Sequence, residues 1–212
     1  TIKTDRAALG RLFKREIEFE EEYQNTQITK SRALNGFSRN DRLNPENNKF
    51  LITIAKATGG RRSDLERVRY SDFKIINNDL YVTFKESKGG KTRTSPILNK
   101  YKEEVLAYIK DKPPLQRLFV NGVNSVADIH AYRRYYAQNL FIDLENNENL
   151  HEKIKNDLEL PNRKDFTYEK GIKGEEYVSS KDDFRGKRDN IYIVSMALGH
   201  NRLNVSVQSY LT

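Results

Sequence analysis

Residues 73–97 read FKIINNDLYVTFKESKGGKTRTSPI, and this stretch decides the class of the fold. Its β-branched and aromatic residues form three short runs, separated by two turn signals, NND at 77–79 and KGG at 88–90. Short runs joined by such tight turns are typical of consecutive antiparallel strands. The stretch therefore predicts a small antiparallel sheet.

Helical patterns flank the predicted sheet on both sides. An asparagine-proline pair at 44–45 is a strong helix start, and the apolar spacing after it ends at the glycine pair at 59–60. A second short helix is expected at 63–69, with Ser63 as its cap. Further helical patterns occupy residues 101–110, 126–144 and 192–198. The fold class predicted from these patterns is mixed, mainly α with a small antiparallel β-sheet (α+β).

Two polar stretches divide the chain. An imperfect apolar stripe predicts a helix at 4–23, and the polar residues 24–42 after it indicate a linker or an arm. Residues 145–190 are polar and of mixed charge, and we expect them to form an insertion with a mobile segment. The predicted organisation is a helical segment with its linker at 1–40 and a domain at 41–212.

The composition bounds the class of partner. Lys and Arg number 38 against 30 Asp and Glu, which gives a formal net charge of +8. This balance suits a polyanion such as nucleic acid, because each neutralised phosphate releases condensed counterions; a soluble protein that is merely basic is the alternative. The absence of cysteine excludes disulfides and thiolate chemistry and fits a reducing compartment. Three histidines, none in a close pair at helical spacing, predict no metal site, and no apolar run approaches the ~20 residues that span a bilayer.

Several polar residues have chemical interest, although each has an ordinary explanation. Arg61 follows a glycine pair and is, in isolation, most simply a solvated residue at a helix start. His130 and Arg133 are three positions apart and share one face of a predicted helix. His200 follows a leucine-glycine pair, and Tyr210 is one of twelve tyrosines. None of these residues alone indicates a site.

Together and in this order, these residues closely resemble the tyrosine site-specific recombinases of the phage-integrase type. The matching segments are ATGGRRSDL at 57–65, SKGGKTR at 87–93, HAYR at 130–133, and LGH at 198–200 followed by Tyr210. Any one motif is weak, but all of them in the correct order are specific. The resemblance covers residues 44–210 and implies the catalytic-domain fold of that family for 41–212. For residues 1–40 it implies a remnant of the N-terminal core-binding domain.

The resemblance implies an enzyme that breaks and rejoins DNA without a metal, a cofactor or ATP. Tyr210 would attack a phosphodiester, form a 3′-phosphotyrosyl link and release a 5′-hydroxyl. Arg61 and Arg133 would clamp the non-bridging oxygens, a role that suits guanidiniums because they stay charged. Lys88, on the predicted hairpin, would protonate the leaving oxygen, with Lys91 as the open alternative.

Two histidines complete the implied site. A tyrosine hydroxyl with its ordinary pKa near 10 is a poor nucleophile, and it needs a base and a cationic pocket. His130 is the expected base or proton shuttle, and His200 is the expected donor to the phosphate. By analogy Asp64, in the helix after Arg61, would support this site without touching the phosphate. An equally good explanation is that Asp64 is a carboxylate in the first turn of a helix, where the helix dipole favours negative charge.

The implied partner is double-stranded DNA carrying attachment sites, on which the protein would assemble as a tetramer. Candidate phosphate contacts are basic residues around the implied pocket. They are Arg62, Lys91, Arg93, Arg134 and Arg202, with Arg67 and Arg69 as further candidates. The resemblance also implies a bacterial or phage-encoded protein of the cytoplasm, associated with the nucleoid and not with a membrane.

Two alternatives stay open. A type IB topoisomerase-like enzyme would use a similar pocket, although the small size and the spacing from the Leu-Gly-His motif to Tyr210 favour a recombinase. A catalytically inactive DNA-binding accessory relative would usually have lost at least one member of the catalytic set. All members of that set are present: Arg61, Lys88, His130, Arg133, His200 and Tyr210.

Overall fold

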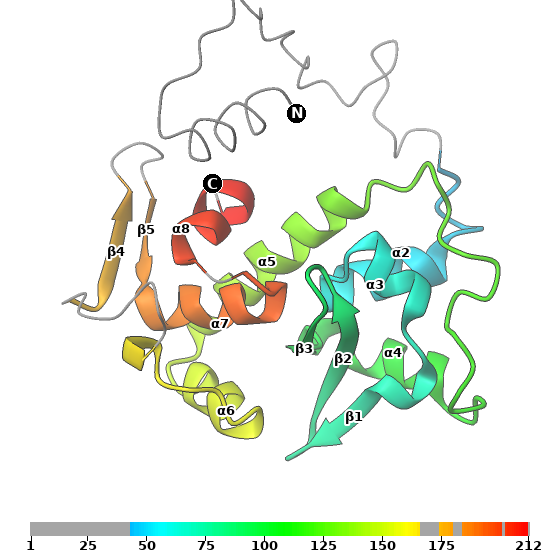
Figure 1. The fold of residues 1–212 in the computed structure, drawn as a ribbon, viewed down its shortest axis with the longest axis horizontal. Coiled ribbons are helices and arrows are strands. Elements are labelled where there is room, and N and C mark those ends of the chain that lie inside the picture. The colour runs from blue at the N-terminus through cyan, green and yellow to red at the C-terminus, as the bar shows by residue number, and fades with distance from the viewer. Residues whose placement is uncertain (1–42, 166–173, 180–183, 201, 212) are drawn as a thin grey trace, which may run out of the picture. The chain divides into compact units, whose positions relative to one another are not determined.

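The structure is a computed structural model that describes residues 43–165, 174–179, 184–200 and 202–211. All of these residues belong to one compact unit, Arg39–Thr212. The helix expected at 4–23 and the linker expected at 24–42 lie outside the described residues, so the division at residue 40 stays a prediction. The described residues form a mixed α+β fold with a small antiparallel sheet, which confirms the predicted class (Figure 1).

The predicted sheet is present together with both of its turns. Strands β1 (Phe73–Ile76), β2 (Asp79–Ser87) and β3 (Lys91–Pro96) are antiparallel, in the order β1-β2-β3. The first turn holds Asn77 and Asn78 at positive φ, a conformation that asparagine tolerates better than most residues. The residues that favour turns in the sequence therefore account for the order of the strands.

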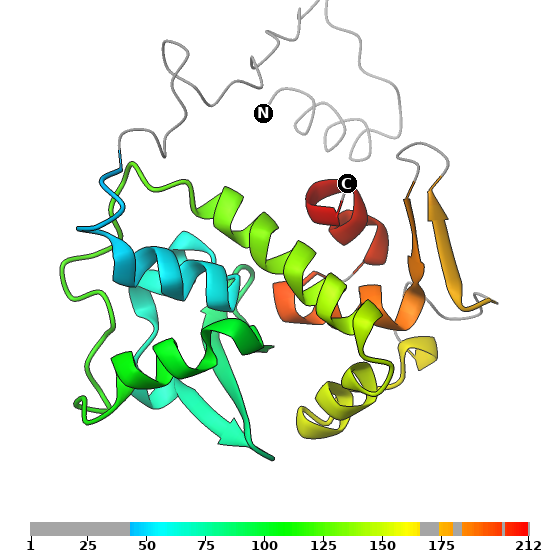
Figure 2. The same ribbon diagram turned by 180° about the vertical axis from the view of Figure 1, so that it is seen from behind.

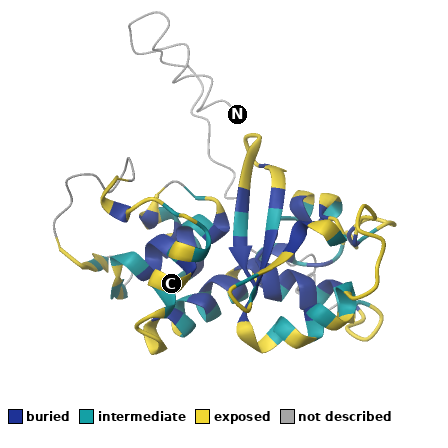
Figure 3. Cartoon of the chain, turned by 90° about the horizontal axis from the view of Figure 1, so that it is seen from below, coloured by how far each residue is buried: buried dark blue, intermediate teal, exposed yellow. Residues whose placement is uncertain are grey.

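A β-bulge shapes the hairpin between β2 and β3. The register of the two strands shifts between Phe84 and Ser87, and Glu86 within this interval has a φ of 50°. An extra residue of this kind re-aims the side chains that follow it. Ser87 is consequently buried, whereas the tip at 88–90 is exposed (Figure 3). The hairpin has a packed base and a solvated tip.

Helix α2 (Lys49–Thr58) begins later than the sequence predicted. The side chain of Asn44 accepts hydrogen bonds from the backbone N–H groups of Glu46 and Asn47, so this segment forms a turn before the helix. The helix ends where predicted, at Gly59, whose φ is 61°. A glycine ends the helix well because its positive φ carries no steric penalty.

Helix α3 (Arg62–Arg67) is capped by a different residue from the one predicted. Its N-cap is Arg61 and not Ser63. The Asp64 carboxylate accepts a hydrogen bond from the Arg61 backbone N–H at 3.1 Å, which satisfies one of the donors at the helix start. The aspartate in the first turn, and not the serine before it, decides the boundary.

The later helices lie where helices were predicted. They are α4 (Lys102–Ile109), α5 (Ile129–Asn146) and α7 (Arg188–Leu198). The side chain of Asp128 caps α5 by accepting a hydrogen bond from the Ala131 N–H at 3.1 Å. Helix α5 packs against α2 on one side and against α7 and the C-terminal turn on the other (Figure 2).

The chain ends in a short helix, α8 (Leu203–Ser206), and a π-helical turn, η5 (Val207–Leu211). This turn packs against α5 and α8. None of the helices in the described ranges combines the length and apolar character that a membrane crossing requires.

Residues 145–190 contain regular structure that their composition did not predict. Within the described part, α6 (Leu150–Asp157) is followed by the antiparallel hairpin of β4 (Glu176–Ser179) and β5 (Phe184–Lys187). A few apolar side chains, such as Ile154, join the core around α5 and α7. These elements are too short and too polar for periodicity to reveal, because their stability comes from packing against helices distant in sequence.

Two clusters of buried residues meet along α5. One lies around the sheet, α2 and α4, and the other lies between α5, α7 and the chain end. At their junction the buried Tyr136 hydroxyl donates to the Pro96 carbonyl at 2.8 Å. A Cβ added to Gly59 would stand 2.3 Å from the Tyr136 ring. The glycine therefore lets the end of α2 approach α5 closely.

Candidate active site

Side chains from separate segments meet at the carboxyl end of α7. Arg61 precedes α3, Arg133 lies on α5, His200 follows α7, and Tyr210 lies in the C-terminal turn. Both arginines donate to the Leu198 carbonyl, Arg61 through Nη2 at 3.1 Å and Arg133 through its own Nη2. The last carbonyls of a helix have no partner within it, so they attract such donors.

The Tyr210 phenol lies in contact with a guanidinium and two imidazoles. Its hydroxyl accepts a hydrogen bond from Arg133 Nε at 3.1 Å. Its ring centroid is 5.3 Å from that of His130 and 5.4 Å from that of His200. The residue is 6% exposed, so water contributes little screening around the ring. A guanidinium in this position would stabilise negative charge that develops on the phenolic oxygen.

Arg133 organises this pocket from the interior. It is 2% exposed, and it donates to the Gly59 carbonyl through Nη1. Its Nη2 also lies 3.5 Å from Nε2 of His200. Burial lowers the pKa of Arg133, and the Tyr210 contact opposes that effect. A bound phosphate would likewise favour the charged guanidinium.

Arg61 is held by a second set of contacts. Its Nη1 donates to Ser87 Oγ at 2.7 Å, and its backbone N–H donates to Asp64. Burial raises the pKa of the Asp64 carboxyl, but the Arg93 charge, the Arg61 N–H and the Ser87 hydroxyl outweigh it and lower the pKa below its usual 3.8. The carboxylate is therefore ionised at neutral pH. Its position behind Arg61 is where the expected buttress would lie.

Lys88 lies at the exposed tip of the β2–β3 hairpin, next to the buried Ser87. Its charge is among those that lower the pKa of His200. Lys91 is also exposed, and it is the register partner of Ser87 across the hairpin. The choice between Lys88 and Lys91 therefore stays open.

His200 is neutral in this environment. Burial, then the charges of Arg133 and Arg61 and more weakly those of Arg93 and Lys88, lower the pKa of His200 to about 3. At pH 7 its ring therefore acts as a neutral donor or acceptor and not as a cation.

This pKa predicts a stability effect. In the unfolded chain His200 binds a proton near pH 6.5, whereas in the folded chain it does so only near pH 3. The contribution of neutral His200 to the free energy of unfolding is therefore fully present above pH 6.5 and is lost as the pH falls toward 3. When the pH falls from 7.5 to 5.5, the free energy of unfolding of the wild type should decrease by about 1 kcal/mol more than that of His200→Asn. One pKa unit corresponds to about 1.4 kcal/mol, and the partial exposure of His200 reduces this value. Urea unfolding at both pH values measures this difference. Equal pH dependence in the two proteins would contradict it.

Arg62 does not project toward solvent as expected for a DNA contact. Its Nη1 donates to the carbonyls of Val123 and Asn124 at 3.0 and 2.9 Å, and its Nη2 donates to the Ala127 carbonyl at 2.8 Å. These bonds fix the loop that leads into α5 and so the position of His130. The loop carbonyls use these donors, and a phosphate contact of Arg62 stays a prediction.

Arg93 is also turned inward, contrary to its expected role in DNA binding. It is 8% exposed and forms an ion pair with Asp64 at 2.8 Å. Its Nη1 donates to the Ala197 carbonyl and to Ser95 Oγ. A Cβ on Gly199 would stand 2.6 Å from Arg93 Cδ, so this glycine allows α7 to end against the buried arginine. The other candidate contacts, Lys91, Arg134 and Arg202, are exposed.

Ser87 is the residue that sequence reasoning missed. It is 4% exposed and accepts a hydrogen bond from Arg61, so it ties the base of the hairpin to the arginine. The available signal was a serine directly before the hairpin lysine, which is too common a pattern to single out. We expect Ser87 to be a positioning residue that acts through Arg61.

Ser87→Ala should slow DNA cleavage about tenfold with little change in KM, because Arg61 loses a hydrogen bond that holds its side chain in place. The loss of this hydrogen bond should also lower the free energy of unfolding by about 1 kcal/mol. Ser87→Thr keeps the hydroxyl and should restore most of the rate. Single-turnover cleavage and thermal unfolding measure the two effects, with the exposed Ser63→Ala as control. A rate in Ser87→Ala equal to that of the control would refute the positioning role.

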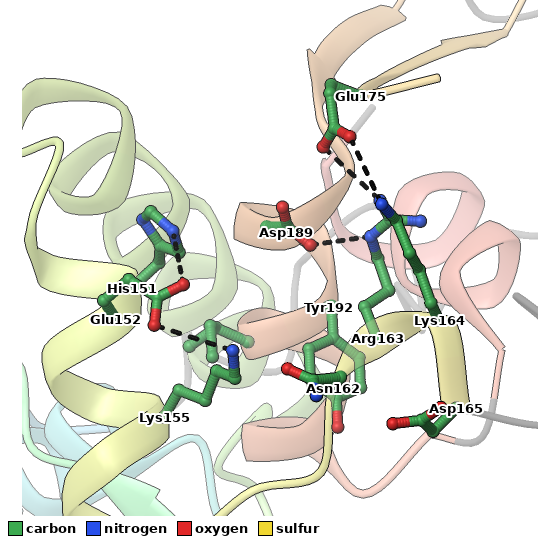
Figure 4. Close-up of a pocket in the computed structure, with 11 residues that line it drawn as sticks. His151, Glu152, Lys155, Asn162, Arg163, Lys164, Asp165, Glu175, Asp189 and Tyr192 are labelled. Atoms are coloured by element: carbon green, nitrogen blue, oxygen red, sulfur yellow. Dashed lines mark hydrogen bonds and ion pairs between the residues drawn. The ribbon is translucent and has the colours of Figure 1, made fainter. Parts of the chain in front are cut away.

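A cavity of about 400 Å³ lies apart from this convergence, between α6, the turn Arg163–Asp165 and α7 (Figure 4). Its charged side chains pair with each other. Arg163 contacts Asp189 at 2.6 Å, and Glu152 contacts both His151 and Lys155. None of the candidate catalytic residues lines it. The cavity is therefore separate from the cluster of side chains around Tyr210.

Comparisons with protein-family models, with curated proteins and with solved structures found no match. The functional assignment therefore rests on the motifs and on the geometry of the pocket.

Proposed function

We propose that this chain cleaves and rejoins DNA as a tyrosine site-specific recombinase, with Tyr210 as the nucleophile. The observation that carries the proposal is the position of the phenolic oxygen, 3.1 Å from Arg133 Nε, in a cluster of side chains that also contains His130, His200 and Arg61. A buried structural tyrosine usually has one hydrogen-bond partner for its hydroxyl. A tyrosine that must attack a phosphate also needs a base and cationic neighbours.

The residues can divide the reaction as follows. The phenolic oxygen attacks phosphorus and forms a phosphotyrosyl bond, while His130 accepts the phenolic proton. The bond from phosphorus to the 5′-oxygen breaks, and Lys88 supplies the proton that this oxygen takes up. Rejoining reverses these steps with the 5′-hydroxyl of a partner strand. One phosphodiester is exchanged for another, so no external energy source is needed.

Arg61 retains donors for a phosphate. A guanidinium has five N–H donors, and Arg61 makes its described side-chain bonds through Nη1 and Nη2 only. The Arg61 and Arg133 guanidiniums both donate to the Leu198 carbonyl, so their charges lie close together. Both charges would stabilise the non-bridging oxygens of a phosphate bound next to them in the transition state.

The test uses a pool of nicked duplexes of randomised sequence, because the target site is not known. Cleavage next to a nick releases a short fragment and traps the protein on the DNA. We expect duplexes that stay attached after denaturation to share a sequence. If no sequence in the pool yields an attached product, the inactive DNA-binding alternative replaces the enzyme.

The recovered sequence then separates the two enzyme classes. A recombinase should join strands of two duplexes that both carry it, whereas a topoisomerase-like enzyme should relax a supercoiled plasmid and exchange no strands. Under this proposal the partners are double-stranded DNA and further copies of the chain, assembled as a tetramer in the cytoplasm.

A further inference from the structure

Three exposed arginines gather beyond the end of α3, outside the candidate active site. Arg67 is the last residue of the helix, and Arg69 follows it. Arg69 pairs with Arg117 in an isolated antiparallel bridge, so these two residues are direct neighbours across two segments. Like charges opposite each other destabilise a pairing unless an anion lies between them. The arrangement therefore favours the binding of an anion.

Two of these guanidiniums are already oriented. Arg67 Nη2 donates to the Glu86 carbonyl at 2.7 Å, and Arg69 Nη1 donates to the Leu115 carbonyl at 2.6 Å. Each bond uses one edge of a guanidinium and leaves other donors available. Groups fixed in this way lose little conformational entropy when a ligand binds.

The three arginines line one hollow of about 250 Å³. Two carboxylates in its wall are already paired, Asp64 with Arg93 at 2.8 Å and Asp72 with Lys85 at 2.6 Å. Glu86 is the remaining acidic residue of the lining. Three guanidiniums thus face one unpaired carboxylate within the described residues, and the hollow is net positive.

We propose that this hollow, lined by Arg67, Arg69 and Arg117, is a second phosphate-binding site that holds the DNA backbone beside the scissile position. Arginine suits this role because its planar fork matches two phosphate oxygens. Helix α3 has six residues, so Arg67 lies about 9 Å along the helix axis from Arg61. The site rests on the proposed function for its role, but it requires only DNA binding for its test.

The test measures the affinity of the protein for a random-sequence duplex at several salt concentrations, in a Tyr210→Phe background that performs no chemistry. Each phosphate contact contributes about 0.9 to the slope of log affinity against log salt. Arg117→Ala should reduce that slope by about 1, and Arg69→Ala with Arg117→Ala by up to about 2. Arg117→Ala removes no side-chain hydrogen bond to the described residues, so it should fold as the parent does.

The control for the double variant is Lys153→Ala with Lys155→Ala, which also removes two positive charges, from α6. Its slope should match that of the parent. An unchanged slope in Arg117→Ala, or an equal reduction in the control, would overturn the site. If inorganic phosphate at matched ionic strength raises the melting temperature while Arg117→Ala leaves duplex affinity intact, the hollow binds free phosphate and not DNA. Failure to trap a covalent product with the parent chain would refute the recombinase and leave this result standing.

Discussion

Tyr210→Phe is expected to abolish covalent attachment of the protein to cleaved DNA, while fold and DNA affinity persist. The change removes one oxygen atom, the proposed nucleophile. The loss includes one hydrogen bond from Arg133 Nε, which corresponds to about 1 kcal/mol of stability, whereas the ring and its packing remain. The adduct should therefore fall below detection although the protein stays folded, as measured by denaturing gel after incubation with the selected nicked duplex.

The matched control is Tyr192→Phe. Tyr192 is buried in α7, and its hydroxyl donates to the Pro161 carbonyl at 2.9 Å, so the same chemical change occurs outside the pocket. This variant should form the adduct at nearly the parent rate. Mass analysis of the nuclease-digested adduct should find the nucleotide on the peptide that contains Tyr210. An adduct that survives in Tyr210→Phe, or a label on another tyrosine, would remove Tyr210 from its assigned role.

Arg133→Ala is expected to have the second-largest effect, on both rate and stability. Loss of one charged stabiliser of the transition state typically costs about 3–4 kcal/mol, or 10²–10³ in rate. The change also leaves the buried Gly59 and Leu198 carbonyls with one donor fewer, at roughly 1–3 kcal/mol for each carbonyl left unsatisfied. Single-turnover adduct formation, with saturating DNA and well below the melting temperature, isolates the rate effect.

Two further variants separate charge from structure. Arg133→Lys keeps a cation but cannot reach Tyr210, Gly59 and Leu198 at once, so it should recover only part of the rate. Arg61→Ala should lose a similar factor in rate with less loss of stability, because the Arg61 side chain is 20% exposed. The exposed Lys74→Ala, on β1, should stay within a few-fold of the parent. Near-normal cleavage by Arg61→Ala and Arg133→Ala would refute the clamp.

Much of the fold was readable from local patterns. The glycine at 59, the asparagines at 77–78 and the glycines at 89–90 each need a positive φ, and each marks a real boundary. The prediction from local patterns was wrong where two capping residues competed. Asp64, and not Ser63, caps the start of α3. The prediction also failed for α6 and the β4–β5 hairpin, because few of their residues are apolar and the partners of those residues lie on α5 and α7.

The sequence predicted which residue types make up the candidate site, but it did not predict the orientation of their side chains. His130, Arg133, His200 and Tyr210 were named from their order along the chain, and the structure brings them into contact. The inward turn of Arg62 and Arg93 was not foreseen. A sequence shows that a residue is charged, but it does not show which distant carbonyls lack a donor.

The sequence by itself determined where the strands turn, where α2 ends, and which side chains with phosphate chemistry the chain carries. These features depend on backbone preferences and on neighbours a few positions away. Only the tertiary structure decided which arginines face the pocket, that Ser87 holds Arg61, and that Arg69 and Arg117 lie side by side. Those outcomes depend on hydrogen bonds and ion pairs between segments that become neighbours only when α5, α7 and the sheet pack together. Local periodicity carries no information about such contacts.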